Sequence, residues 1–382
     1  MTDVVILPGG SRYVVRGADV SPGSAPAQSR VAYAAAHVVA DPLADNVPGA
    51  PAELDWDATL AFRHHLWRHG LGVAEAMDTA QRGMGLDYPA VRSLVARSAA
   101  EARAVGGRIV AGVATDQLPA GPVSLADVLA AYRSQLEDVV GAGAVPVLMC
   151  SRHLAAAARG PEDYLSVYSS LLSEVDSPVL LHWLGAVFDP ALEGYWGSAS
   201  PRAAAETLLT LLKDHGDVVD GVKMSLLDAD FEVDVRRRLP AGVRMYTGDD
   251  FAYPSLIAGD EQGHSDALLG VFAAIAPIAG RALATLDSGD VTAFRALLDP
   301  TVPLARHLFG APTQYYKTGI VFLSWLAGHQ DHFTMVGGLQ SGRSPAHLAR
   351  LLVLADEAGL LPDASLAAAR ARAFFTTCGV GA

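Results

Sequence analysis

Lysine is rare in this sequence, and one lysine stands where its amine could do chemistry. Of the 28 lysines and arginines, only Lys213, Lys223 and Lys317 are lysine. Arginine keeps its proton in proteins, whereas a lysine shielded from water can lose its proton and act as a nucleophile. Lys223 lies near the end of an apolar run, Val218-Val-Asp-Gly-Val-Lys-Met-Ser225, which predicts a buried strand. We interpret Lys223 as a candidate for amine chemistry, and the alternative is that its side chain simply reaches solvent at the strand end.

Polar residues end several other apolar runs. His182 interrupts the run that begins at Val179, and a histidine with a pKa of about 6.5 suits acid and base catalysis at neutral pH. The candidates for substrate binding follow other runs: Thr79, Ser225, Arg152 and Asp249. Ordinary alternatives exist, because a buried histidine often has one backbone partner, and Asp249 or Asp250 could cap the next helix.

A metal site is a further alternative. His37, His153, His182 and Asp249 each follow or end a different apolar run and could converge on an ion. No short spacing such as His-x-His or His-Glu-x-x-His supports such a site. We therefore expect no metal and no cofactor, and keep a metal-dependent isomerase or hydro-lyase as the second interpretation.

The elements that would position these residues form a regular alternation. Eight apolar runs predict strands over residues 31–40, 73–78, 109–114, 145–150, 179–182, 218–225, 243–247 and 267–271. Segments with helical spacing lie between them, over residues 56–70, 88–105, 124–141, 161–174, 201–215, 230–239 and 251–259. This alternation is typical of an α/β protein whose parallel strands close into a (β/α)₈ barrel. No Gly-x-Gly-x-x-Gly follows a strand, which disfavours a doubly wound sheet.

The two ends of the chain differ from this alternation. Residues 4–16 predict a short hairpin around Gly9 and Gly10, and Pro22–Ser29 has the composition of a linker. After Pro277 the helical segments follow one another without strands, over residues 279–286, 291–298, 302–308, 316–327 and 345–358. We therefore divide the chain into an N-terminal hairpin and linker (1–29), a barrel (30–276) and a C-terminal helical segment (277–382).

Composition limits the partners of the protein. The chain has 382 residues, 51% of them hydrophobic, and a net charge of −13, which argues against nucleic acid or an anionic membrane surface as a partner. No apolar run reaches the length of about 18 residues that a membrane span needs. Cys150 and Cys378 are too few for a disulfide framework, so we expect a soluble, cytoplasmic protein.

The order of these residues resembles a known group, the dihydrodipicolinate synthase and N-acetylneuraminate lyase superfamily of Schiff-base aldolases. Gly221-Val-Lys-Met-Ser-Leu-Leu-Asp228 is similar to the family's Gly-Ile-Lys-(Asp/Glu)-x-(Ser/Thr)-Gly-(Asp/Asn), and Tyr246-Thr-Gly-Asp-Asp250 to its Ser-Gly-Asp-Asp turn. Weaker similarity covers much of residues 30–362, including the segments 54–60, 109–115 and 311–317. The resemblance implies an imine-forming lysine at Lys223, a small-molecule carbonyl substrate and a homo-oligomer.

Two departures from the family bear on the reaction. The chain has Asp78-Thr-Ala-Gln-Arg82 where the family has Gly-Thr-Thr-Gly-Glu, so that Thr79 keeps a hydroxyl but the double threonine is gone. It has His182-Trp-Leu-Gly185 where the family has Tyr-Asn-x-Pro, so that His182 would replace the proton-relaying tyrosine. We therefore predict a carbon-carbon or carbon-oxygen lyase that acts on a 2-oxo acid or a keto sugar. A non-catalytic sugar-acid-binding protein is the third interpretation.

Overall fold

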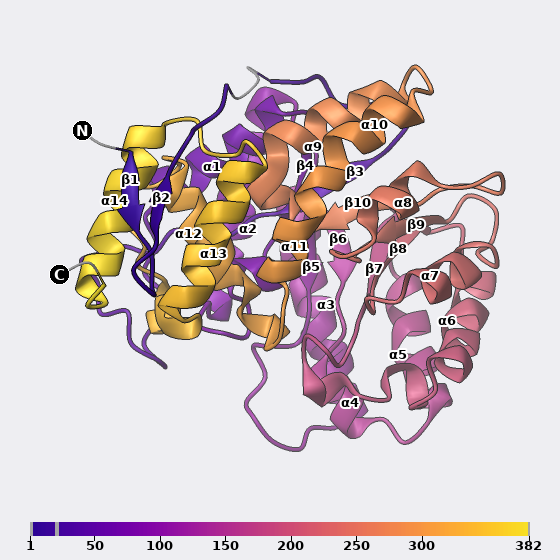
Figure 1. Ribbon diagram of the computed structural model, residues 1–382. Helices are drawn as coiled ribbons and strands as arrows, with labels where there is room; N and C mark the ends of the chain where they lie inside the picture. The colour runs from indigo at the N-terminus through magenta and orange to yellow at the C-terminus, as the bar shows by residue number, and fades with distance from the viewer. Residues whose placement is uncertain (1–2, 20–22, 381–382) are drawn as a thin grey trace.

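The centre of the molecule is a closed barrel of eight parallel strands, seen in a computed structural model that describes residues 3–19 and 23–380 (Figure 1). In barrel order the strands are β3 (Ala32–Ala35), β4 (Gly72–Glu75), β5 (Ile109–Val113), β6 (Val145–Leu148), β7 (Val179–Leu184), β8 (Val219–Ser225), β9 (Arg244–Thr247) and β10 (Asp266–Leu269). Strand β10 pairs with both β9 and β3 and closes the barrel. The predicted (β/α)₈ barrel is confirmed, although several strands end earlier than their apolar runs.

Side chains of β8 alternate between the barrel interior and the surrounding helices, as in any strand. Gly221 faces the interior, because a Cβ on it would meet the ring of Tyr246 at 2.6 Å. Tyr246 belongs to the small group of side chains that fills the barrel. Two and four residues further along the strand, Lys223 and Ser225 share the face of Gly221, so they point inward at the carboxyl end of the barrel.

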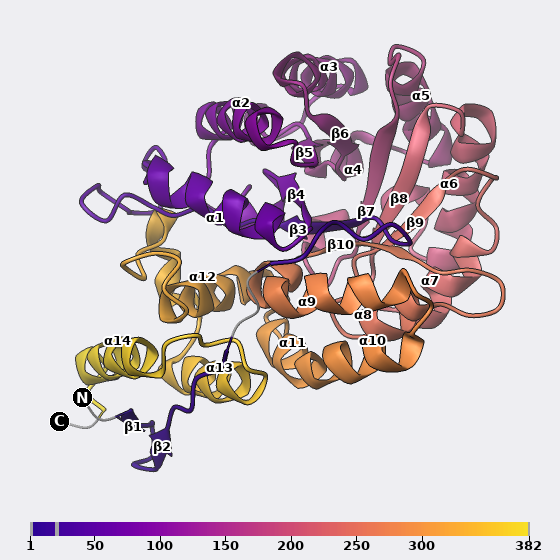
Figure 2. The same ribbon diagram turned by 90° about the horizontal axis from the view of Figure 1, so that it is seen from above.

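Helices cover the outside of the barrel, as the view from above shows (Figure 2). They are α1 (Trp56–Arg68), α2 (Tyr88–Val105), α3 (Leu125–Ala142), α4 (Arg152–Ala157), α5 (Pro161–Leu172), α6 (Pro201–His215), α7 (Ala229–Arg236), α8 (Tyr253–Ala258) and α9 (Phe272–Leu286). The seven predicted helices are present, and Asp55 and Ser124 cap α1 and α3 with their side chains. Helix α4 was not predicted, although α8, which is equally short, was.

The N-terminal hairpin is confirmed and packs on the far end of the chain. Strands β1 (Val4–Ile6) and β2 (Arg12–Val14) pair antiparallel, and β1 lies against helix α14 (Ala364–Thr377) (Figure 1). The carboxylate of Asp356 anchors the hairpin, since it accepts hydrogen bonds from the Tyr13 hydroxyl at 2.7 Å and from the amide of Gly17 at 3.0 Å. The predicted linker begins at Pro22, outside the described residues, and residues 23–29 form neither helix nor strand.

The C-terminal segment is helical, as predicted. Its helices are α10 (Val291–Leu298), α11 (Val302–Leu308), α12 (Tyr316–Leu326), α13 (Pro345–Glu357) and α14, of which only α14 was not predicted. Helix α9 runs across Pro277, where the predicted boundary lay, with a break in helical geometry at Ile275. The division of the chain into three segments therefore stays a prediction.

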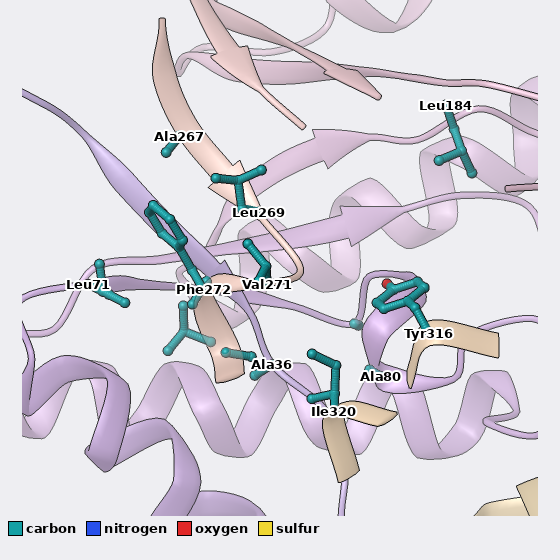
Figure 3. Packing of buried hydrophobic residues seen from close by; sticks show 14 of the residues in the cluster. Ala36, Leu71, Ala80, Leu184, Ala267, Leu269, Val271, Phe272, Tyr316 and Ile320 are labelled. Atoms are coloured by element: carbon teal, nitrogen blue, oxygen red, sulfur yellow. The ribbon is translucent and has the colours of Figure 1, made fainter. Parts of the chain in front are cut away.

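Helix α12 connects this segment to the barrel. Every one of its residues is buried, and Tyr316 and Ile320 at its start lie beside Ala80 and Ala36 at the barrel mouth (Figure 3). A helix that is buried on all sides is a core element. Neither α12 nor any other helix among the described residues is long and apolar enough to cross a membrane.

Candidate active site

Lys223 opens on a small cavity at the carboxyl end of the barrel. Its side chain is largely buried, with the residue 7% exposed, and the cavity measures about 20 Å³. Within the described residues, no hydrogen bond or ion pair engages the Lys223 amine. A lysine that only reaches solvent would be exposed at its end, which Lys223 is not, and its role as a reactive amine stays a prediction.

Two aspartates border the same cavity. Burial lowers the pKa of Lys223, and the charges of Asp78 and Asp250 oppose this shift. Burial also raises the pKa of Asp250 to about 8, although the carboxylate accepts a hydrogen bond from the amide of Val271 at 2.9 Å. Both directions have the same cause, since burial penalises each charged form. The surroundings therefore favour a neutral amine beside a protonated carboxyl group, which is the state that a lysine nucleophile needs.

The opposite wall of the cavity comes from the C-terminal segment. The hydroxyls of Thr79 and Tyr316 form a hydrogen bond of 2.7 Å, and both residues line the cavity. Burial raises the pKa of Tyr316 well above 10, so its hydroxyl keeps its proton and acts as a neutral hydrogen-bonding group. The structure thus places Thr79 in the cavity wall, where substrate binding by its hydroxyl stays a prediction. It adds Tyr316, which the sequence indicates only as part of the segment 311–317.

His182 lies beneath the cavity rather than in its wall. Strand pairing sets it beside Lys223, and its Nε2 forms a hydrogen bond of 3.2 Å with Oγ of Ser225, which does line the cavity. His182 is 1% exposed, and burial together with the charge of Lys223 lowers its pKa well below 6.5. The expectation of a histidine pKa near neutrality was therefore wrong for this site. Its proposed role as acid or base stays a prediction, and its one hydrogen bond toward the cavity among the described residues is the one with Ser225.

The two aspartates that follow β9 have different places. One carboxylate oxygen of Asp249 accepts hydrogen bonds from the amides of Phe251 at 2.8 Å and Ala252 at 2.9 Å, so this side chain stabilises the turn before α8. Asp250 instead lines the cavity beside Lys223. Sequence analysis treated both as possible helix caps, and their order in the chain contains no signal that tells them apart. Substrate binding by Asp249 stays a prediction.

A larger cavity of about 580 Å³ adjoins the first and shares Asp78 and Leu184 with it. Arg152 lies in its wall, where its guanidinium pairs with the carboxylate of Asp189 at 2.5 Å. Thr115 also lines it, with its hydroxyl 2.6 Å from that of Ser151. The structure therefore brings Thr79, Ser225 and Lys223 together in the smaller cavity and places Arg152 in the adjoining one.

Arg82 also lines the larger cavity, but its guanidinium is engaged by the protein. It donates to both carboxylate oxygens of Asp116, at 2.9 and 2.6 Å, and to the carbonyl of Gly112 at 2.6 Å. These bonds tie the loop after β4 to β5. A guanidinium with this many partners is a structural group and has little capacity left for a substrate anion.

The candidate metal ligands do not converge. His37 pairs with Gln330 at 2.9 Å, His153 with Thr115 at 3.0 Å, and His182 with Ser225. Among the residues that the structure describes, no group of three or more histidine, cysteine or carboxylate side chains is arranged to hold a metal ion. The geometry therefore supports the lysine, rather than the histidines, as the centre of the site.

Fold and site together define the class of protein: a (β/α)₈ barrel whose sixth strand carries a buried, unpaired lysine at its carboxyl end. The family described as "Protein of unknown function (DUF993)" matches residues 11–380, and the chain belongs to this family. A comparison with the curated proteins finds no match.

Several solved structures similar to this chain are described as dihydrodipicolinate synthases. The enzyme of Aquifex aeolicus is 13% identical with a TM-score of 0.66, over 87% of this chain and 99% of that chain. The enzyme of Thermotoga maritima is 15% identical with a TM-score of 0.64, over 87% and 100%. The 4-hydroxy-tetrahydrodipicolinate synthase of Methylacidiphilum fumariolicum is 15% identical with a TM-score of 0.64, over 86% and 95%. At these identities the likeness confirms the predicted resemblance as one of fold.

Proposed function

We propose that the protein is a lyase that forms a Schiff base between Lys223 and a small carbonyl substrate, a 2-oxo acid or a keto-sugar derivative. One observation carries this proposal: the Lys223 amine is buried, has no partner among the described residues and faces a cavity that it shares with Asp250. A structural lysine would be paired or exposed, because an unpaired buried amine destabilises the folded protein. The similar solved structures support the proposal through their fold.

The chemistry follows from the groups in the cavity. The neutral amine of Lys223 attacks the carbonyl carbon, and Asp250 donates a proton to the carbinolamine oxygen, which leaves as water and forms an iminium ion. The iminium accepts the electron pair of the C–C bond that breaks as a base removes a proton from the substrate hydroxyl. The resulting enamine is then protonated on carbon, and water hydrolyses the imine and frees Lys223. The same iminium would support condensation by the reverse steps, or loss of a hydroxyl as water.

The other residues have supporting roles in this proposal. The hydroxyls of Thr79 and Tyr316 hold a substrate oxygen, and Ser225 carries a proton between substrate and His182. Binding by Arg152 would require the carboxylate of Asp189 to give up its ion pair. A cytoplasmic homo-oligomer stays a prediction.

The test is borohydride trapping with a panel of 2-oxo acids and keto sugars, followed by mass spectrometry of the intact protein and its peptides. We expect an adduct on the peptide that contains Lys223, and none in the Lys223→Met variant. Lys213→Met is the matched control, because Lys213 is exposed on α6 and its loss should leave the adduct unchanged. An adduct that persists in Lys223→Met would contradict the proposal. Binding of a carbonyl compound without any adduct would favour the non-catalytic interpretation.

A further inference from the structure

The charges around Lys223 restrict the substrate that can reach it. Besides Lys223, the ionisable carboxyl groups of Asp78 and Asp250 line the small cavity, and none of its described lining residues is another lysine, an arginine or a histidine. The Asp78 carboxylate makes no hydrogen bond or ion pair with the described part of the chain. It therefore faces the pocket as a free acceptor with a negative charge.

Nearby cations do not compensate for this charge within the cavity. Arg152 and Arg82 line only the larger cavity, and each is held by its own carboxylate, Asp189 or Asp116. Lys317 is buried and interacts with the charge of Asp78, but it lines neither cavity and its Nζ donates to the sulfur of Met84 at 3.2 Å. Among the described lining residues of this cavity, the Lys223 amine is thus the single group that can carry a positive charge beside a ligand anion.

The geometry of an imine brings the carboxylate of a bound 2-oxo acid close to Asp78. Its carboxylate is bonded directly to the carbonyl carbon, so it lies about two bond lengths, roughly 2.5 Å, from Nζ once the imine forms. It therefore lies in the space around the Lys223 amine, whose wall includes Asp78. A hydroxymethyl group or a hydrogen at this position carries no charge, and a hydroxymethyl group can donate a hydrogen bond to the carboxylate.

The remaining walls suit a polyhydroxylated molecule. Phe309 and Tyr316 stack with ring centroids 4.3 Å apart, and Phe188 meets both rings edge-on, which gives an aromatic wall for C–H groups. Hydroxyls of Thr79 and Ser225 line the same space. The adjoining cavity of about 580 Å³ has room for the rest of a sugar-length chain.

We propose that the substrate of Lys223 is a polyhydroxylated ketone or aldehyde with no carboxylate on its carbonyl carbon, and that Asp78 excludes 2-oxo acids. This inference rests on the proposed Schiff-base function and narrows it to one of its two substrate classes. Asp78 is the specificity-determining residue, since its carboxylate accepts a substrate hydroxyl where a 2-oxo acid would present a second negative charge.

The test compares dihydroxyacetone with pyruvate, which present a hydroxymethyl group and a carboxylate at the same position. Each is incubated with the full chain and cyanoborohydride, and the rate of adduct formation on Lys223 is divided by the rate on a free lysine derivative. We expect this corrected rate to be at least tenfold higher for dihydroxyacetone than for pyruvate. In Asp78→Asn and Asp78→Ser, which keep a polar group without the charge, the preference should fall by about tenfold through faster trapping of pyruvate.

The outcomes separate the two proposals. Equal or faster trapping of pyruvate in the wild type overturns the exclusion by Asp78 and leaves the Schiff-base function standing. An unchanged preference in both well-folded Asp78 variants also overturns it, because the discrimination would then come from another group. Absence of any adduct on Lys223 with dihydroxyacetone, glyceraldehyde and pyruvate alike overturns the Schiff-base function and this inference with it.

Discussion

Glu75 and Lys223 both stand at the carboxyl ends of barrel strands, β4 and β8, yet their surroundings are opposite. Glu75 and its partner Arg63 are fully buried, and two hydrogen bonds of 2.8 Å join them. Arg63 also donates to the carbonyls of His37 and Thr59, at 2.5 and 3.0 Å. Lys223 has no such partner in the described chain and faces a cavity.

This contrast teaches how to tell structural charges from functional ones in this barrel. A buried ion pair is tolerated when every donor and acceptor is satisfied, and removing one partner is then strongly destabilising. A buried amine left unpaired weakens the fold but keeps its lone pair available for reaction. We therefore expect substitutions around Lys223 to change activity more than stability, and substitutions around Arg63 to do the reverse.

The largest effect is expected for Lys223→Met. Turnover of the trapped substrate should be lost, because no other amine lines the cavity in the described residues. Stability to urea should stay the same or rise, since the substitution replaces a buried amine with an apolar side chain of similar length. Measurable turnover by the purified variant, or a large loss of stability, would show that Lys223 has a structural role, like Arg63 and Glu75.

Asp250→Asn should reduce kcat by about 10² to 10⁴, the usual contribution of a positioned acid or base. The wild type should lose kcat/KM as pH rises through about 8, where Asp250 gives up its proton. Lys223 and Asp250 titrate together, so this value belongs to the pair. The variant should lack this alkaline decline. An unchanged kcat with an unchanged pH profile would show that Asp250 takes no part in proton transfer.

On the structural side, Arg63→Met should destabilise the protein by about 3 to 5 kcal/mol, because it leaves the Glu75 carboxylate buried without its partner. Urea unfolding measures this loss. The double variant with Glu75→Gln is the matched control and should recover much of the stability, since the two effects are coupled. Specific activity per folded molecule should change little. A loss below about 1 kcal/mol, or no recovery in the double variant, would contradict the structural role that distinguishes Arg63 from Lys223.

The smallest effect is expected for His65→Gln, which should change how the folding stability depends on pH. Burial lowers the pKa of His65 to about 2, and its ring packs 4.1 Å from that of His329. An unfolded histidine titrates at about 6.5, so below this pH the unfolded state binds the extra proton and folding stability falls as pH falls. Between pH 7 and 5.5, His65→Gln should therefore lose about 1 kcal/mol less stability than the wild type. Burial raises the pKa of Glu232 to about 8, so this group makes the folded protein more stable as pH falls. Its contribution is the same in the wild type and the variant and cancels when the two are compared.

Denaturant unfolding of both proteins at the two pH values measures this difference. Equal pH dependence would show that the ring of His65 accepts a proton in the folded state. Burial would then not keep the His65 ring neutral.

Local patterns in the sequence were sufficient to predict the barrel. Each strand shows as an apolar run and each long helix as a repeat of buried positions, so eight strands and seven helices could be predicted. The place of Lys223 near the carboxyl end of a buried strand could be predicted as well, and its role as a reactive amine stays a prediction. Helix α4, which follows Ser151, was missed, although the equally short α8 was predicted.

The composition of the cavity could not be obtained in this way, because its members come together only in three dimensions. Asp250 and Asp249 are neighbours in the chain, but the turn before α8 directs one to Lys223 and the other to backbone amides. Tyr316 is 93 positions from Lys223 in the numbering and reaches the cavity because α12 packs on the barrel mouth. Burial then sets the direction of each pKa, and burial is a property of the packed molecule. Sequence therefore determined where the proposed nucleophile stands, and tertiary packing decided which groups surround it and in which direction burial shifts their pKa values.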